Sequence, residues 1–260
     1  MFGICNQSVV PCREEPTHKS EMVSQLLFGE HFSILEEKEE WIKLKFATDG
    51  YEGWISDKQF SPIRENTFHE LNSEPSKIVS DLISIVTEVQ GNSSFPLVMG
   101  SVLPKLNGNK LKLENRDYIF EGSFSDFKEK KSSSSIIKTA FLFLNSPYLW
   151  GGRTSLGIDC SGFSQMAFRL NGYQLPRDAS QQAEIGDALN FVEEAKEGDL
   201  AFFDNEEGKI THVGIIMKDQ QIIHASGKVR IDKFDHFGIF HSENKKYSHK
   251  LRVIKKVLSN

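Results

Sequence analysis

Residues 150–163 read Trp-Gly-Gly-Arg-Thr-Ser-Leu-Gly-Ile-Asp-Cys-Ser-Gly-Phe, a glycine-rich loop that leads into the first turn of a predicted helix. Apolar residues at helical spacing from Phe163 to Leu170 indicate the helix, and Asn171-Gly172 predicts its end. Cys160 therefore lies at a helix N-terminus, where unpaired N–H groups and the helix dipole lower the pKa of a thiol and favour the nucleophilic thiolate. The alternative is that Cys160 is a small buried apolar residue, the usual position of a free cysteine.

The segments around this loop predict an α+β domain at residues 131–260. Before the loop, an amphipathic helix begins at Ile136 and is ended by Pro147. After it, three short apolar runs predict successive strands of an antiparallel sheet, at residues 199–203, 213–217 and 222–223. Helices followed by a sheet are typical of the α+β class.

The N-terminal half of the chain reads as two small β-rich units. Alternating apolar residues over 32–46 and the turn at 48–50 are typical of a small β-barrel, which we place at residues 1–62. A second β-rich unit is predicted at residues 63–130, followed by a linker that combines the polar run 128–131 with four serines.

The second unit is predicted to contain a helix over residues 75–90. Four apolar residues share one helical face, and a proline occupies a position that the first turn tolerates. These residues are Ile78, Leu82, Ile85 and Val89, with Pro75 in the first turn.

Two histidines flank a predicted hairpin. His212 precedes the strand 213–217, and His224 closes the run 222–223. If the hairpin is centred on Lys218, the two histidines lie directly opposite, with Cβ atoms about 5 Å apart. A cysteine peptidase needs a thiolate, an imidazole that takes and returns its proton, and a third polar group that orients the imidazole. The alternative is that both histidines are ordinary polar residues at a sheet edge. The other six histidines have no comparable setting: His18, His31, His69, His236, His241 and His249.

Composition excludes several classes of function. The 3 cysteines are too few for a disulfide framework, and the Cys-x-x-Cys and His-Glu-x-x-His spacings of zinc sites are missing. The sequence contains no Walker loop, and Gly151-Gly152 is too short for a dinucleotide fingerprint. We therefore expect no metal and no cofactor.

The charge distribution indicates which partners the protein takes. The net charge is -5, and residues 1–60 hold 11 acidic against 6 basic residues. Such a segment repels nucleic acid and other polyanions and suits a partner that presents an ammonium group. No apolar stretch reaches the 18 residues of a membrane span, and Pro11 and Arg13 interrupt the place of a secretory leader. We expect a cytoplasmic protein, or a periplasmic or secreted one if a leader has been removed.

Six motifs follow one another in the second half of the chain. They are Pro147-Tyr-Leu-Trp-Gly-Gly-Arg-Thr, Gly157-Ile-Asp-Cys-Ser-Gly-Phe, Leu175-Pro-Arg-Asp-Ala-Ser-Gln-Gln, Glu197-Gly-Asp-Leu-Ala-Phe-Phe, Thr211-His-Val-Gly-Ile and Ile223-His-Ala-Ser. In this order, over residues 135–260, they resemble the motifs of the NlpC-type cysteine peptidases, which have a papain-like fold. The resemblance implies that Cys160 is the nucleophile, His212 the general base and acid, and His224 the orienting residue. It places Tyr148 near the oxyanion site. We expect activity to fall at acidic pH as the histidine pair becomes charged.

Two N-terminal segments extend the resemblance. Residues 21–30, Glu-Met-Val-Ser-Gln-Leu-Leu-Phe-Gly-Glu, and residues 49–55, Asp-Gly-Tyr-Glu-Gly-Trp-Ile, resemble the bacterial SH3-type domain of dipeptidyl-peptidase-like members. The resemblance implies small SH3-like barrels before the peptidase domain. It also implies a substrate, namely murein peptides with a free N-terminal L-Ala, cleaved between D-Glu and diaminopimelate or lysine. The pocket for the free amino group is implied to contain Glu21, Tyr51, Asp159 and Ser161.

The alternative readings for Glu21 and Tyr51 are a solvated charge and an aromatic residue on the barrel surface. Two other functions remain open from the sequence: a secreted hydrolase that cuts intact peptidoglycan, and an inactive protein that binds the cell wall.

Overall fold

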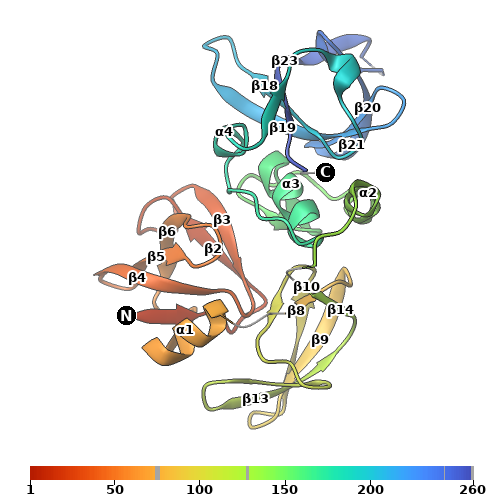
Figure 1. Ribbon diagram of the computed structural model, residues 1–260. Helices are drawn as coiled ribbons and strands as arrows, with labels where there is room; N and C mark the ends of the chain where they lie inside the picture. Colours follow the sequence, from red (N-terminus) through yellow and green to blue (C-terminus); the bar gives the residue numbers. More distant parts are fainter. Residues whose placement is uncertain (74–76, 127–128, 243, 259–260) are drawn as a thin grey trace.

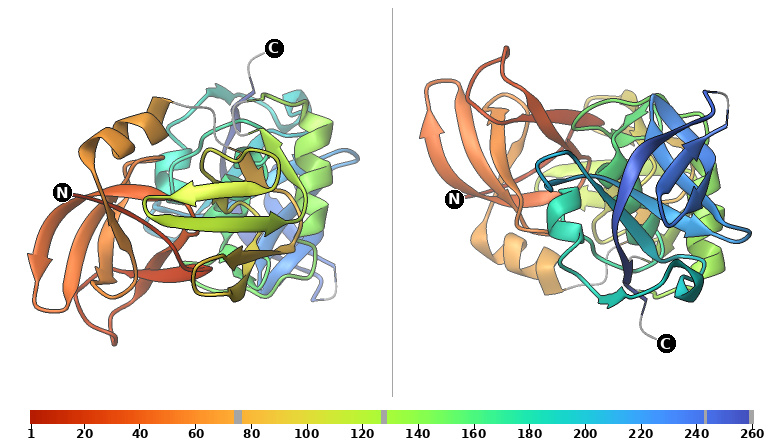
Figure 2. Two further views of the ribbon diagram at one scale, coloured as in Figure 1. Left: turned by 90° about the horizontal axis from the view of Figure 1, so that it is seen from below. Right: turned by 90° about the horizontal axis from the view of Figure 1, so that it is seen from above.

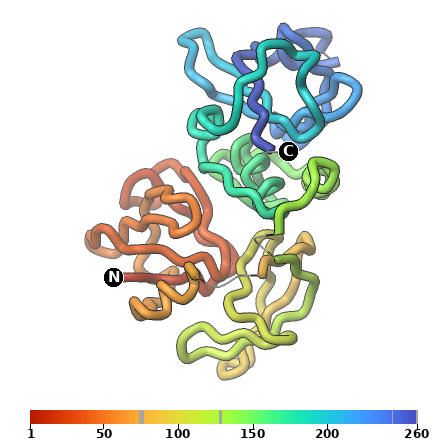
Figure 3. The backbone as a smooth tube through the Cα atoms, viewed as in Figure 1, coloured from red at the N-terminus to blue at the C-terminus, as the bar shows by residue number. Residues whose placement is uncertain are grey.

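The computed structural model describes residues 1–73, 77–126, 129–242 and 244–258 of the chain. Figure 1 shows three lobes, and the first (red to orange) and the second (yellow to light green) lie below the third (green to blue). The chain completes each lobe before it enters the next (Figure 3). Seen from below, the second lobe lies in front of the third, and the first lobe lies to one side (Figure 2).

The first lobe is a seven-stranded antiparallel sheet with the strand order β3-β2-β6-β5-β4-β1-β7. Its strands are β1 (Phe2–Ile4), β2 (Val9–Arg13), β3 (Met22–Leu27), β4 (His31–Lys38), β5 (Trp41–Phe46), β6 (Glu52–Ser56) and β7 (Ser61–Ile63). In β5 the apolar side chains of Ile42, Leu44 and Phe46 are buried, whereas Lys43 and Lys45 between them are more exposed. This alternation is the period of two that the sequence predicts.

The second lobe contains two small sheets, ordered β10-β9-β13-β12 and β11-β8-β14. Their strands are β8 (Lys77–Val79), β9 (Ile83–Glu88), β10 (Ser93–Val98), β11 (Val102–Leu103), β12 (Lys110–Leu113), β13 (Arg116–Glu121) and β14 (Phe124–Asp126). An apolar cluster that includes Ile4 and Phe28 of the first lobe and Val86 and Phe120 of the second joins the two lobes.

The predicted helix over residues 75–90 is wrong, because β8 and β9 occupy this segment. Ser84 and Val86 are buried while Ile83 and Ile85 are exposed, so β9 follows a period of two. Short apolar runs fit both the helical period of 3.6 residues and the strand period of two. The sequence of this segment therefore allowed either a helix or a strand. The helix of this region is α1 (Glu65–Ser73), whose Phe68 ring stacks on Phe2 with centroids 4.3 Å apart. Pro75 and Lys128, in the predicted helix and linker, lie outside the described residues.

The third lobe packs helices against the outside of a barrel. The helices are α2 (Ser133–Leu142), α3 (Cys160–Arg169), α4 (Ala179–Gln182) and the 3-10 turn η1 (Val192–Glu194). The strands are β15 (Arg153–Thr154), β16 (Gly157–Ile158), β17 (Asp187–Leu189), β18 (Leu200–Asp204), β19 (Ile210–Met217), β20 (Gln221–Ser226), β21 (Lys228–Asp235), β22 (Gly238–His241) and β23 (Lys246–Lys256).

Six of these strands close into the barrel in the order β23-β18-β19-β20-β21-β22, because β22 also pairs with β23. Phe163 of α3 and Val213 of β19 belong to the core between the helices and the barrel, whereas Phe203 and Phe234 belong to the core inside the barrel. The predicted α+β class and the helix that begins at Cys160 therefore agree with the structure.

A buried ion cluster joins the first lobe to the third. The guanidinium of Arg153 binds both carboxylate oxygens of Glu30 at 3.0 Å, and Arg169 of α3 binds the same carboxylate. Burial alone would raise the pKa of Glu30, but the two arginines lower it to about 2. Close to this cluster, a Cβ on Gly151 would lie 2.2 Å from the carbonyl oxygen of Met22. The glycine-rich loop therefore packs directly on the first lobe.

Candidate active site

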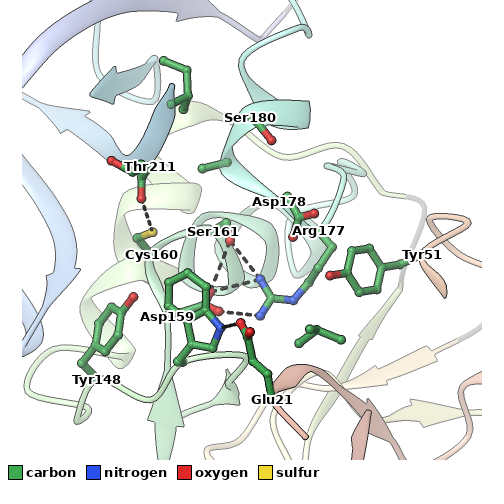
Figure 4. Close-up of a pocket in the computed structure, with 14 residues that line it drawn as sticks. Glu21, Tyr51, Tyr148, Asp159, Cys160, Ser161, Arg177, Asp178, Ser180 and Thr211 are labelled. Carbon is green, nitrogen blue, oxygen red and sulfur yellow. Dashed lines mark hydrogen bonds and ion pairs between the residues drawn. The ribbon is translucent and has the colours of Figure 1, made fainter. Parts of the chain in front are cut away.

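Cys160 is the first residue of α3, and the residue before it caps the helix. Asp159 Oδ1 accepts a hydrogen bond from the Gly162 N–H at 2.6 Å, and Oδ2 accepts from the Gly151 N–H at 2.9 Å. The cap fixes the end of the glycine-rich loop. Cys160 Sγ lies 3.9 Å from the carbonyl oxygen of Thr211, on the strand that carries His212 (Figure 4).

The thiol of Cys160 is neutral in this state. Burial raises its pKa to about 12, and the negative charge of Asp159 acts in the same direction, while N–H groups of Val213 and Ser161 act against it. The N–H group at the helix start lowers the thiol pKa as predicted, but desolvation outweighs it, so the net shift in the resting site is upward. If Cys160 is the nucleophile, as the motifs predict, its thiol needs a base to take the proton.

His212 and His224 meet on the face of the sheet that forms the barrel interior. His212 Nε2 and His224 Nδ1 are 2.8 Å apart, and both side chains are almost fully buried. In the register of β19 and β20, however, Gly214 lies opposite His224, so the hairpin is centred on Asp219 and not on Lys218. The prediction that the two histidines lie directly opposite is therefore wrong, and they meet diagonally.

Gly214 makes the diagonal contact possible. A Cβ at this position would lie 2.7 Å from Ile222 Cδ1 and 3.0 Å from His224 Cβ. Without a side chain at Gly214, the ring of His224 can reach along the sheet to His212. Cys160 Sγ contacts the Thr211 carbonyl, and within the described residues no hydrogen bond joins it to the His212 ring.

Sequence reasoning missed two side chains around the histidine pair. Asp232 Oδ2 lies 3.0 Å from His224 Nε2, and Arg230 in turn binds Asp232. The His249 ring stacks on His212 with centroids 4.1 Å apart and an interplanar angle of 24°. The statement that His249 has no comparable setting is therefore wrong. Its position depends on the register of β23, which no local motif encodes.

Burial controls the charge of all three histidines. It lowers the pKa of His212 well below 6.5 and that of His249 to about 4, and the other histidines of the cluster act in the same direction. Burial also lowers the pKa of His224, although Asp232 acts against it. The three rings are neutral at pH 7, and the expected loss of activity at acidic pH lies below pH 6.5.

A cavity of about 510 Å³ opens beside Cys160 and gathers the predicted binding residues (Figure 4). Its lining includes Glu21, Tyr51, Tyr148, Asp159, Cys160 and Ser161. The first lobe supplies Glu21 and Tyr51, and the third lobe supplies the others. The structure therefore brings all these residues together at one site, whereas their individual roles remain predictions.

Asp159 is already occupied by a buried arginine. Arg177 Nη2 lies 2.5 Å from Asp159 Oδ2, and Nη1 donates to Ser161 Oγ at 2.9 Å. Because this carboxylate is neutralised and also caps α3, the carboxylates that remain for a ligand are those of Glu21 and Asp178. Asp178 lines the same cavity, and burial raises its pKa. Asp178 belongs to the motif at residues 175–182, for which no role was predicted.

Tyr148 and Trp150 complete the cavity. Burial and the neighbouring Cys160 raise the pKa of Tyr148, so its hydroxyl remains a hydrogen-bond donor. The backbone N–H of Tyr148 donates to the Gly227 carbonyl at 3.0 Å, which holds the residue next to the barrel. The indole N–H of Trp150 donates to Glu21 and links the catalytic loop to the first lobe.

Over the described ranges, no cluster of three or more His, Cys, Asp or Glu side chains is arranged to hold a metal ion. The helices in these ranges are also too short or too polar to span a membrane.

Comparisons with known proteins identify the family. A model of the NlpC/P60 family matches residues 145–250, and a model of the bacterial dipeptidyl-peptidase SH3 domain matches residues 12–60. The γ-D-glutamyl-L-lysine dipeptidyl-peptidase of Bacillus subtilis strain 168 is 30% identical over 240 residues, which cover 86% of this chain and 75% of that protein. A protein of the same name from Bacillus cereus ATCC 10987 is 29% identical over 80% of this chain and 68% of its own length.

A solved structure shares the whole fold. The crystal structure of an NlpC/P60 family protein from Bacillus cereus ATCC 10987 covers 100% of both chains with a TM-score of 0.83 at 20% identity. The predicted family is thus confirmed by sequence, and the arrangement of the three lobes recurs in a known structure. The chain is a peptidase of the NlpC/P60 family, and its first lobe carries an SH3 domain of the bacterial dipeptidyl-peptidase type.

Proposed function

We propose that this protein cleaves the bond between γ-D-Glu and the following diamino acid, diaminopimelate or lysine, in small murein peptides that begin with a free L-Ala. The names of the two Bacillus relatives support the bond. The main support for a free N-terminus on the substrate is the cavity beside Cys160, in which Glu21 and Asp178 present carboxylates. An ammonium group forms charge-assisted hydrogen bonds with such carboxylates, whereas a neutral, acylated terminus does not.

The proposed reaction is acyl transfer in two steps. Cys160 Sγ attacks the γ-carbonyl carbon of D-Glu while its proton passes to His212, and the carbonyl oxygen becomes an oxyanion. The Tyr148 hydroxyl and backbone N–H groups donate to this oxyanion. Collapse of the tetrahedral intermediate breaks the C–N bond, and His212 returns the proton to the departing amine.

Hydrolysis of the thioester completes the cycle. His212 removes a proton from water, the resulting hydroxide attacks the thioester carbonyl, and the sulfur leaves. L-Ala-D-Glu is released with a free γ-carboxylate, and His212 protonates the Cys160 thiolate. The neutral thiol and neutral imidazole of the resting site are thereby restored.

We also propose a separate role for each lobe. Residues 1–62 form an SH3-type domain that closes one end of the groove, residues 63–130 form a second small SH3-like domain, and residues 131–260 form the peptidase domain. Cys5, Cys12 and Cys160 are all free thiols. This supports peptide recycling in a reducing cytoplasm.

Two peptides, each with a free and with an acetylated N-terminus, and one inactive variant test the proposal. Purified protein is incubated with L-Ala-γ-D-Glu-diaminopimelate, with the lysine analogue, and with the N-acetylated form of each, and products are followed by mass spectrometry. We expect L-Ala-D-Glu from the free-amine peptides alone and no turnover by Cys160→Ala. Cleavage of acetylated and free peptides at equal rates would contradict a role for the free N-terminus. Release of peptides from intact peptidoglycan would favour a wall hydrolase.

Glu21→Gln tests the pocket itself. The isosteric change removes the charge and should raise KM for the free-amine peptide, while kcat changes little. Glu37→Gln is the matched control, because Glu37 is exposed on β4 outside the cavity. An unchanged KM in Glu21→Gln would contradict the assignment of Glu21.

A further inference from the structure

A buried carboxylate of β21, that of Asp232, lies behind the histidine pair. Asp232 is buried, with 3% of its side chain exposed, and lies 3.0 Å from His224 Nε2. Arg230, two residues earlier on the same strand, binds both carboxylate oxygens: Nη2 lies 2.9 Å from Oδ1, and Nε lies 2.6 Å from Oδ2. None of the motifs that identify the family includes Asp232 or Arg230.

A carboxylate accepts hydrogen bonds and cannot donate them, so the geometry fixes where the protons lie. His224 Nε2 must carry a proton in order to donate to Asp232. The Nδ1 atom of a neutral His224 is then an acceptor, and its partner at 2.8 Å, His212 Nε2, must carry the donated proton. The free lone pair of His212 is therefore on Nδ1.

We propose that Asp232, anchored by Arg230, is a positioning residue that sets the tautomers of His224 and His212 and leaves His212 Nδ1 as the base for Cys160. The constellation is then Cys160, His212, His224 and Asp232, in which Asp232 orients His224 and His224 orients His212. The proposal rests on thiol chemistry at Cys160 and not on which peptide is cleaved.

Asp232 and Arg230 also act on the charge of the pair, in opposite directions. When His212 accepts the proton of Cys160, the negative charge of Asp232 stabilises the imidazolium through His224, and the positive charge of Arg230 weakens this effect. The other titratable groups that act on the pair are His249 of β23 and His241 of β22, and both lower the pKa of a histidine in it. Removing Asp232 should therefore lower the pKa of the base, and removing Arg230 should raise it.

The test is the pH profile of kcat and KM for Asp232→Asn and Arg230→Gln. For Asp232→Asn we expect kcat at the optimum to fall about 10–100-fold, as for carboxylates that orient metal-binding imidazoles, with KM within about twofold of wild type. The acidic limb should move to lower pH in Asp232→Asn and to higher pH in Arg230→Gln. Asp232→Glu keeps the charge. It should therefore restore part of kcat and leave the acidic limb at the same pH as in the wild type.

Asp235→Asn is the matched control, because Asp235 lies on the same strand but binds Tyr247 and not a histidine. It should leave kcat and the limb unchanged. A purely structural role for Asp232 predicts that Asp232→Asn lowers the melting temperature and the amount of active enzyme without moving the limb, and this result would overturn the proposal.

A measurement on the wild-type protein avoids any folding defect of the variants. Nitrogen-15 NMR of the histidine rings at pH 7 should show the Nε2–H tautomer for both His224 and His212, and an Nδ1–H tautomer at either residue would refute the assignment. If no murein peptide is cleaved, the pH dependence of Cys160 alkylation by iodoacetamide replaces the kinetic readout. A failure of the proposed substrate is thus separated from a failure of this inference.

Discussion

Glu30→Gln should destabilise the whole protein, because Glu30 is the counter-ion of two buried arginines. Glu30 and Arg153 are each 1% exposed at the side chain and Arg169 is 5% exposed, so water cannot replace the lost charge. The Glu30 carboxylate also accepts a hydrogen bond from the Leu27 N–H at 2.8 Å, which fixes the turn before β4. Glutamine keeps the shape of the side chain but removes the negative charge that both guanidinium groups bind.

The expected loss can be estimated in two ways. Removing one partner of a buried ion pair costs about 3–5 kcal/mol, because the remaining charge stays desolvated. The depression of the Glu30 pKa from 4.5 to about 2 corresponds to about 3 kcal/mol of stabilisation at pH 7. A loss of this size should lower the melting temperature by roughly 10 °C in a protein of this length.

The pH dependence has a definite sign. The pKa of Glu30 is lower in the folded protein than in the unfolded chain, so the stabilisation is complete above pH 4.5 and is lost as the pH falls towards 2. The difference between wild type and Glu30→Gln should therefore shrink by about 2 kcal/mol between pH 7 and pH 3.

Urea unfolding followed by circular dichroism at both pH values measures this difference. Glu37→Gln, an exposed position on β4, should change the free energy of unfolding by less than about 0.5 kcal/mol. The reasoning fails if Glu30→Gln is as stable as wild type at pH 7, or if its deficit is the same at pH 3.

Three further predictions concern catalysis. Gly214→Ala should push His224 away from His212, since the new Cβ would lie 3.0 Å from His224 Cβ, and should lower kcat about 100-fold with little change in KM; a wild-type kcat would contradict the packing argument. Tyr148→Phe removes the proposed oxyanion donor and should lower kcat about 100-fold in steady-state assays; an unchanged kcat would contradict this role. His249→Phe keeps a ring stacked on His212 and should retain most activity, whereas His249→Ala should lose about tenfold in kcat; equal rates for the two variants would exclude a role for the stack.

The positions of the candidate catalytic residues could be predicted because local sequence encodes them. The glycine-rich loop and the helix that follows place Cys160 at a helix N-terminus, and the structure has α3 begin at that residue. The centre of the β19–β20 hairpin lies one residue after the predicted centre, because the turn contains Asp219 and Gln220 in the left-handed region, with φ values of 56° and 54°. Neither residue is a glycine, so the usual signal for such a turn is missing.

The supporting residues could not be predicted, because they depend on contacts between distant strands. Asp232 and His249 reach the histidine pair only through the registers of β21 and β23. The thiol pKa also depends on tertiary structure. The helix terminus is visible in the sequence, whereas the burial of Cys160 and the enclosed charge of Asp159 are not. Desolvation reverses the sign of the expected shift.

The position of the ion cluster predicts that stability and specificity are coupled in this protein. Glu30 lies nine residues after Glu21 in the first lobe, and its partner Arg153 lies three residues after Trp150, whose indole binds Glu21. The same two segments therefore dock the lobes and form one wall of the cavity. A change that loosens the cluster should displace the Glu21 carboxylate from the cavity while Cys160, His212 and His224, all within the third lobe, keep their mutual geometry. Glu30→Gln should then raise KM for the free-amine peptide more than it lowers kcat.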